Sequence, residues 1–184
     1  MNKVVISVLG QDRPGIIARV SGALFCRDCN IENVSQTILQ SEFSGIFIAE
    51  IPEDMSLKEL ETYLTAETAH MGLHIFVKAL AVQESPPATK ETHPFVVTTR
   101  GPDRKGLVAT VTAIIARHHV NVSNLQAVFK GGDDPNRNIM IYEVDIPAET
   151  DQKALEDELR EKAGELGLEI SIQHRKIFET MNRI

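Results

Sequence analysis

The chain has 184 residues, of which 26 are acidic and 19 are Lys or Arg, so its formal net charge is −7. Because no stripe of basic residues runs along it, the sequence disfavours direct binding of DNA or RNA, which depends on neutralising phosphates. The apolar run at residues 4–9 is far too short to span a membrane, and nothing at the N-terminus resembles a signal peptide. We therefore expect a cytoplasmic protein that makes no membrane contact.

The first half of the chain predicts a strand, a helix, two strands, a second helix and a final strand. Residues 3–9 are rich in β-branched side chains, and the helix after them is expected to be capped by Asp12 and to end near Cys29 and Asn30. Residues 31–42 and 43–51 predict two strands that turn near residues 41–44. A capping box at residues 56–59 opens the second helix, Gly72 ends it, and residues 73–82 predict the fourth strand.

The second half predicts the same order of elements. Its strands are expected at residues 95–99, 122–130, 138–146 and 168–177, its helices at 105–118 and 151–166, and a long hairpin loop at 130–137. The composition of the intervening segment predicts domains at 1–83 and 93–184 with a linker at 84–92. Each half is thus predicted to be an α+β, ferredoxin-like β-α-β-β-α-β domain, in which a four-stranded antiparallel sheet carries two helices on one face.

The two halves also repeat in sequence. Residues 10–18 return as residues 101–109 at an offset of 91, and nine of the 32 aligned pairs from residue 4 to residue 35 are identical. Average composition would give about two identical pairs. A repeat of this length indicates a duplicated domain rather than a solenoid unit.

The repeated segment joins a strand, a glycine-bounded turn and a helix start, where backbone N–H groups can hold a small anion. We interpret Gly15 and Gly106 as positions that allow close backbone approach, so that the carboxylate of an amino acid can sit at the helix N-terminus. The side-chain oxygens of Asn30 and Asn121 could then accept from its ammonium group. The alternative is purely structural: the Asp residues cap, Pro14 starts the helix, and the glycines permit tight packing.

Individual residues of the two turns carry competing interpretations. Asp12 and Asp103 are favoured as helix caps over ligand contacts. Arg13 and Arg104 are the charged residues best placed to meet a carboxylate or an acidic group of a partner, although a solvated role is equally compatible with the sequence.

The strands of the two halves differ in hydropathy. Strand residues of the first half are apolar on both sides, whereas those of the second half alternate with polar residues, as expected for a sheet covered on one face only. The free face of the first sheet is therefore expected to be covered by the sister domain or by another subunit, which favours a homodimer.

No constellation of catalytic or metal-binding residues stands out. Cys26 and Cys29 lie toward the end of a predicted helix, where thiols are not activated, and no matching pair completes a zinc site. His118 and His119 fit a favourable position near a helix C-terminus. We expect neither an enzyme nor a bound cofactor.

The segment Asp12-Arg13-Pro14-Gly15-Ile16, with Asn30 and Ile31 opening the next strand, resembles an ACT domain, the small-molecule-sensing module of amino-acid metabolism. The second copy, at residues 103–107 with Asn121 and Val122, resembles another. A pair of ACT domains of this length is most similar to the glycine cleavage system transcriptional repressor family. The opening motif also resembles formyltetrahydrofolate deformylases, but no catalytic domain follows it here.

This resemblance implies that the turn of each copy embraces an amino acid. The implied contacts come from Gly10, Asp12, Arg13, Gly15, Ile16 and Asn30 in the first copy, and from Gly101, Asp103, Arg104, Gly106, Leu107 and Asn121 in the second. Lys105 replaces Pro14 in the second copy, so the two sites are not expected to be equivalent.

The function implied is that of a non-enzymatic regulator that responds to a small amino acid such as glycine or serine. It would act through a protein partner, with a transcription factor as one candidate, and not by contacting nucleic acid itself. The alternatives are a constitutive interaction scaffold that has lost its ligand and an accessory subunit in one-carbon or folate metabolism.

Overall fold

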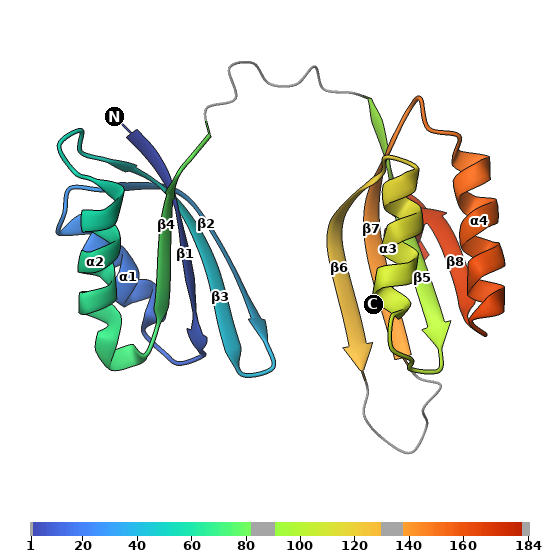
Figure 1. The fold of residues 1–184 in the computed structure, drawn as a ribbon, viewed down its shortest axis with the longest axis horizontal. Coiled ribbons are helices and arrows are strands. Elements are labelled where there is room, and N and C mark those ends of the chain that lie inside the picture. The colour runs from blue at the N-terminus through green and yellow to red at the C-terminus, as the bar shows by residue number, and fades with distance from the viewer. Residues whose placement is uncertain (1, 82–90, 130–137, 182–184) are drawn as a thin grey trace. The chain divides into compact units, whose positions relative to one another are not determined.

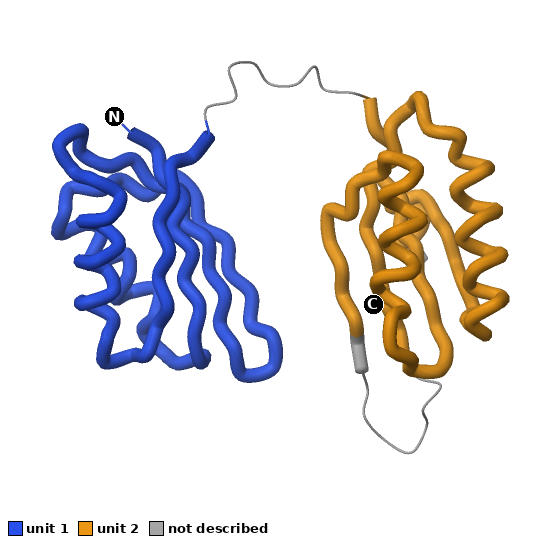
Figure 2. Tube along the Cα trace, viewed as in Figure 1, with its two compact units in different colours: residues 1–84 blue, residues 85–184 orange. Residues whose placement is uncertain are grey.

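The computed structural model describes residues 2–81, 91–129 and 138–181 (Figure 1). The chain divides into two compact units, Met1–Glu84 and Ser85–Ile184 (Figure 2). Most of the predicted linker and the whole hairpin loop expected at residues 130–137 lie outside the described residues. The first strand of unit 2 begins at Thr92, inside the segment expected to be linker.

Both units have the predicted α+β, ferredoxin-like topology. Unit 1 consists of β1 (Asn2–Gln11), α1 (Ile16–Phe25), β2 (Asn30–Leu39), β3 (Glu42–Ile51), α2 (Leu57–Thr68), a 3₁₀ turn (Ala69–Met71) and β4 (His74–Ala79). Unit 2 consists of β5 (Thr92–Gly101), α3 (Leu107–Arg117), β6 (Asn121–Phe129), β7 (Asn138–Pro147), α4 (Gln152–Glu165), β8 (Glu169–His174) and α5 (Arg175–Met181). The antiparallel sheets run β2-β3-β1-β4 and β6-β7-β5-β8, each with its first two helices on one face (Figure 1).

The strand register of unit 1 decides which apolar residues face the helices. Val4, Ile6 and Val8 of β1 are buried in the core, together with Phe43 and Phe47 of β3. The alternate residues form the opposite side, which we call the outer face of unit 1: Val5, Leu9, Ile46, Ile48 and Phe76. No described element of unit 1 covers this face, and Phe76 is 59% exposed. The expected apolar free face is therefore present on unit 1.

The corresponding face of unit 2 is covered by a helix that the sequence analysis missed. The strand expected to continue to residue 177 ends at His174, and α5 follows directly. Arg175 Nη2 lies 3.1 Å from Glu143 Oε2, on the outer side of β7, and Val96 on the same side is only 2% exposed. Helix α5 contacts β5 and β8, so it covers a face that was expected to be exposed to solvent.

The ends of the first helices also differ from expectation. Helix α1 ends at Phe25, and Asp28 adopts the left-handed conformation (φ 54°) that was expected of Asn30. The amide of Cys29 donates to Leu24 O (3.1 Å), which closes the helix before Asn30 opens β2. His119 (φ 58°) repeats this ending in unit 2. A short polar residue or a histidine thus supplies the left-handed turn in each copy.

The second helix of each unit has a side-chain cap. As predicted, Ser56 caps α2, since its Oγ accepts from the amide of Glu59 at 3.2 Å. In unit 2, Asp151 Oδ1 accepts from the amide of Ala154 at 3.0 Å and caps α4. Gly72 follows the 3₁₀ turn in the left-handed conformation (φ 66°), as expected of a helix-ending glycine.

Removing these caps should cost a modest and measurable part of the stability. We expect Ser56→Ala and Asp151→Ala each to lower the free energy of unfolding by about 1 kcal/mol, because an amide of the first turn loses its acceptor. Chemical denaturation followed by circular dichroism measures the loss. Ser56→Thr is the matched control, since Thr retains the hydroxyl. A loss as large in the Thr variant would contradict the capping role.

Candidate ligand sites at the repeated loops

The loop between β1 and α1 borders a small pocket in unit 1. The pocket has a volume of about 230 Å³ and is lined by Asp12, Arg13, Gly15, Ile16, Ile17, Ala18, Gln36 and Phe43. Ile16 and Phe43 are each 2% exposed and form an apolar floor, whereas Asp12 and Arg13 are exposed at the rim. Pockets for drug-sized ligands have volumes of about 300–1,000 Å³, so this one suits a smaller molecule.

The helices that start at the repeated loops have no side-chain caps. Gly15 and Gly106 occupy the N-cap positions, and no side chain accepts from either first turn. The first intrahelical bond of α1 runs from the amide of Arg19 to Gly15 O (2.9 Å), which leaves the amides of residues 16–18 without an intrahelical acceptor. The amide of Thr110 donates to Gly106 O in the same way. These amides can donate hydrogen bonds to an external anion.

The expectation that the loop aspartates cap these helices is wrong. The backbone amide of Asp12 donates to Ser41 O (2.7 Å), and this bond ties the loop to the β2–β3 turn. Asp103 Oδ1 accepts from Nδ2 of Asn138 at 3.5 Å. Both carboxylates are left outside the helix starts because the left-handed glycine, not the aspartate, is the residue that precedes the first helical turn.

The glycines of the loops have two different roles. A Cβ at Gly10 would lie 2.8 Å from Leu73 Cδ2, and one at Gly101 would lie 2.7 Å from Leu168 Cδ2. At Gly15 and Gly106 a Cβ would meet nothing within 4 Å, so close packing does not explain either residue. Their φ values of 96° and 88° explain the glycines, because residues with an L side chain rarely adopt this left-handed conformation. The space beside each helix start is open.

The cationic residues of the loops lie exposed beside the uncapped helix starts. Within the described ranges, no hydrogen bond or ion pair involves the side chains of Arg13, Arg104 or Lys105. Unit 2 has two cations here where unit 1 has one, because Lys105 stands in place of Pro14. Both loops therefore combine uncapped amides with available positive charge.

Asn30 and Asn121 do not lie near the loops of their own units. Asn30 pairs with Glu50, which in turn pairs with Lys3 at the start of β1, whereas the loop follows Gln11 at the other end of that strand. Asn121 pairs with Asp145 at the corresponding end of the second sheet. The sequence-based expectation that each asparagine contacts a ligand at the loop of its own unit therefore does not fit this geometry.

Gln36 is the pocket residue that the sequence analysis missed. It lies on β2 opposite Gly45, on the same face of the sheet as Phe43. The strand register shows that Gln36 faces the pocket. From the sequence alone Gln36 would be assigned to the opposite face, because a β-bulge between Ile31 and Asn33 reverses the in-and-out alternation of the side chains that follow it.

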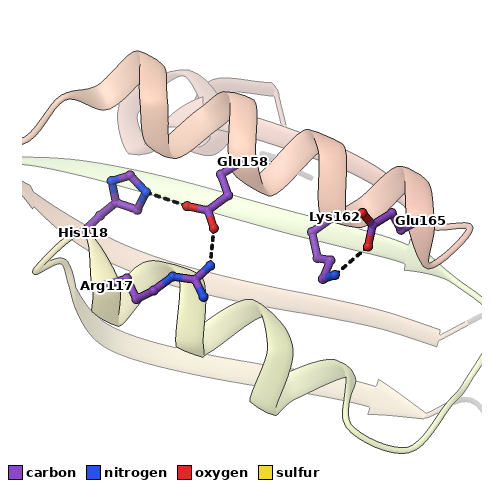
Figure 3. A network of polar contacts seen from close by, with 5 residues as sticks. All are labelled: Arg117, His118, Glu158, Lys162 and Glu165. Carbon is purple, nitrogen blue, oxygen red and sulfur yellow. Dashed lines mark hydrogen bonds and ion pairs between the residues drawn. The ribbon is translucent and has the colours of Figure 1, made fainter.

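A polar network joins the two main helices of unit 2 away from the loop (Figure 3). Glu158 of α4 accepts from Arg117 and from Nε2 of His118 (2.8 Å), at the end of α3. The hydrogen bond from His118, with the charge of Arg117, holds the pKa of Glu158 below its ordinary value despite some desolvation. Lys162 and Glu165 pair further along α4. This network fastens α3 to α4.

The lowered pKa of Glu158 predicts an acid-sensitive unit 2. A carboxylate whose pKa is lower in the folded state contributes stability above its unfolded pKa, near 4.5, and loses it as the pH falls through the folded value. We expect Glu158→Gln to be less stable than the parent at neutral pH, with the difference shrinking as the pH falls below about 4.5. Denaturation curves between pH 3 and 7 measure this; a difference that is independent of pH would contradict it.

In the part of the chain that the structure describes, no group of three or more His, Cys, Asp or Glu side chains is placed to hold a metal ion. Cys26 is exposed and Cys29 buried, and burial raises the pKa of the Cys29 thiol. None of the described helices is long and apolar enough to cross a membrane.

Comparison with known proteins gives the family. The ACT-domain family model matches residues 2–78 and 93–173. A UPF0237 protein of Methanopyrus kandleri is 34% identical over 79 residues, which are 42% of this chain and 88% of that protein. The glycine cleavage system transcriptional repressor of Escherichia coli is 28% identical over 122 residues, 66% of this chain and 62% of that protein.

Two solved structures share the fold of both units. A protein of unknown function from Galdieria sulphuraria has a TM-score of 0.75 at 23% identity, covering 94% of this chain and 98% of that one. A protein provisionally named as a glycine cleavage system transcriptional repressor has a TM-score of 0.67 at 21% identity, with 94% and 96% covered. With a family match over each unit, the chain belongs to the ACT-domain family, as a regulatory protein built from two ACT domains in tandem.

Proposed function

We propose that this protein is a sensor of a small amino acid, which binds at the two repeated loops. The observation that carries the proposal is the contrast between the helices of each unit. Helices α2 and α4 are capped by side chains, whereas α1 and α3 begin with a left-handed glycine and uncapped amides beside available cations. ACT domains typically bind small amino acids, and this arrangement supplies the partner for a carboxylate.

Each part of an amino acid has a partner in the pocket of unit 1. The carboxylate accepts from the first-turn amides of α1 and meets the charge of Arg13. The ammonium group is held by the carboxylate of Asp12 and the side-chain oxygen of Gln36, which line the same pocket. The apolar floor of Ile16 and Phe43 leaves room for a small side chain, which favours glycine or serine.

The output of the sensor is regulation through a cytoplasmic protein partner, without catalysis. The net charge of −7 makes direct DNA binding unfavourable, so a role in transcription requires a separate DNA-binding protein. The name of the 28% identical repressor of Escherichia coli supports the glycine cleavage system as the regulated process. The ligand must bind one arrangement of the chain more tightly than another to change partner affinity.

A thermal-shift titration with the twenty amino acids tests the proposal. We expect glycine or L-serine to raise the melting midpoint in a saturable manner, since a ligand that binds only the folded state stabilises it. Large amino acids should have little effect because the pocket of unit 1 measures only about 230 Å³. No stabilisation by any of the twenty would overturn the proposed function.

The outer face of unit 1 favours a second candidate, a constitutive interaction protein. Leu9, Ile46 and Phe76 are 49–59% exposed there, and contiguous exposed apolar residues mark interaction surfaces. We infer that this face mediates homodimer formation. A scaffold without a ligand would self-associate normally and fail the amino-acid titration, which separates the two functions. An accessory subunit in one-carbon metabolism would instead co-purify with a catalytic subunit.

A further inference from the structure

The two units differ in polarity directly beneath their loops. On the helix-facing side of the sheet, unit 1 has Val8 next to the strand end and Phe43 opposite Gly10. The same register positions of unit 2 hold Thr99 and, opposite Gly101, Asn138. Phe43, which lines the pocket of unit 1, thus has an amide in its place in unit 2, and the core residue Val8 has a hydroxyl in its place.

The polar atoms of these two residues are buried and unpaired. Thr99 is 0% and Asn138 is 5% exposed, and neither Thr99 Oγ1 nor Asn138 Oδ1 has a hydrogen-bond partner among the described residues. The third such atom, Arg175 Nε, belongs to a residue that pairs with Glu143 on the opposite side of the sheet. An unsatisfied buried polar group costs about 1–3 kcal/mol, so two side by side indicate a missing partner.

Neighbouring residues connect these two atoms to the loop. Nδ2 of Asn138 donates to Asp103 Oδ1 in the β5–α3 loop at 3.5 Å, which fixes the orientation of the amide and leaves its Oδ1 unpaired. Thr99 lies two residues before Gly101 on the same strand face, diagonal to Asn138. The N-terminus of α3, an eleven-residue helix without a side-chain cap, starts from the same loop.

We propose that the second unit binds a small amino acid with a side-chain hydroxyl, and that Thr99 and Asn138 determine this preference. The inference rests on the proposed function and deepens it. The ligand carboxylate accepts from the amides of α3, and its ammonium group pairs with Asp103. The ligand hydroxyl accepts from Thr99 and donates to Asn138 Oδ1, which satisfies both buried atoms. With Val8 and Phe43 at the same positions, unit 1 makes no such selection.

L-serine and L-alanine are the probes that test the preference, because they differ by one hydroxyl. We expect calorimetry on the full chain to show that L-serine binds about tenfold more tightly than L-alanine. In Thr99→Val this preference should fall to near unity. The ligand-free variant should also melt about 4 °C higher, because Val removes an unpaired hydroxyl at nearly constant volume.

Thr112→Val is the matched control, since its hydroxyl donates to Val108 O (2.7 Å) within α3. This variant should keep the preference for L-serine. Asn138→Leu provides the second measurement and should lose the preference as Thr99→Val does.

The possible failures can be told apart. If Thr99→Val keeps the serine preference, or melts lower because a bridging water held the two atoms, the inference is overturned while the proposed function stands. If glycine, L-alanine and L-serine all fail to bind the parent protein, the proposed function itself is overturned, and this inference with it.

Discussion

Replacing both loop glycines, as Gly15→Val and Gly106→Val, should weaken amino-acid binding by at least about tenfold while leaving both units folded. The φ values of 96° and 88° are strongly unfavourable for a β-branched residue, with a cost of about 1–2 kcal/mol or more at each position. Relaxing this strain turns the first-turn amides away from the ligand. No atom lies within 4 Å of either new Cβ, so the core is not disturbed. Calorimetry with glycine and L-serine measures the loss.

Gly22 and Gly164 provide the control for this prediction. Both lie within helices, α1 and α4, and a Cβ at either position would meet nothing within 4 Å. Gly22→Ala and Gly164→Ala should therefore raise stability by about 0.5–1 kcal/mol each and leave binding unchanged. Equal loss of binding in both pairs of variants would show that the left-handed loop conformation has no special role.

Introducing a lysine should have different effects on stability on the two faces of the first sheet. Phe47 is 0% exposed in the core of unit 1, so Phe47→Lys buries a charge without a partner. We expect a loss of more than about 4 kcal/mol, a large part of the stability of a small domain. Phe76, on β4, lies on the outer face and is 59% exposed, so Phe76→Lys should leave the fold intact.

The homodimer proposal predicts a different readout for Phe76→Lys. A charge on the outer face should dissociate the parent dimer into monomers, as measured by sedimentation at micromolar concentration. Lys78 pairs with Val5 and therefore lies on the same outer face as Phe76, two residues away on β4. Lys78→Ala removes a charge from this face instead of adding one, so it should leave the dimer assembled. If the parent protein sediments as a monomer, the homodimer proposal is wrong.

The topology was predictable because it depends on local patterns. The apolar spacing of α1 and α3, the capping serine of α2 and the strand alternation each specify an element without reference to distant residues. The internal repeat predicted that the chain contains two domains of the same fold. The outer side of the first sheet was predicted to be apolar, but only the register in which Ser7 pairs with Phe76 identifies the residues on it.

The site was less predictable because its geometry is tertiary. Aspartate is a common helix-capping residue, yet the backbone amide of Asp12 donates to Ser41 O in the next hairpin and its side chain does not cap α1. Gln36 reaches the pocket through a β-bulge, and α5 covers its sheet through Arg175 and two carboxylates on β7. The unpaired polar atoms of Thr99 and Asn138 could not be predicted, because the spacing of residues in the sequence does not show which polar atoms are buried without a partner.

The central claim is that the uncapped first turns of α1 and α3 hold the carboxylate of an amino acid, and amide NMR tests it most directly. On titration of the ¹⁵N-labelled protein with glycine or L-serine, the account predicts that the largest shifts fall on the amides of residues 16–18 or 107–109. The amides that follow the capping residues Ser56 and Asp151 should not move. Saturable binding whose shifts lie away from residues 16–18 and 107–109 would contradict the account.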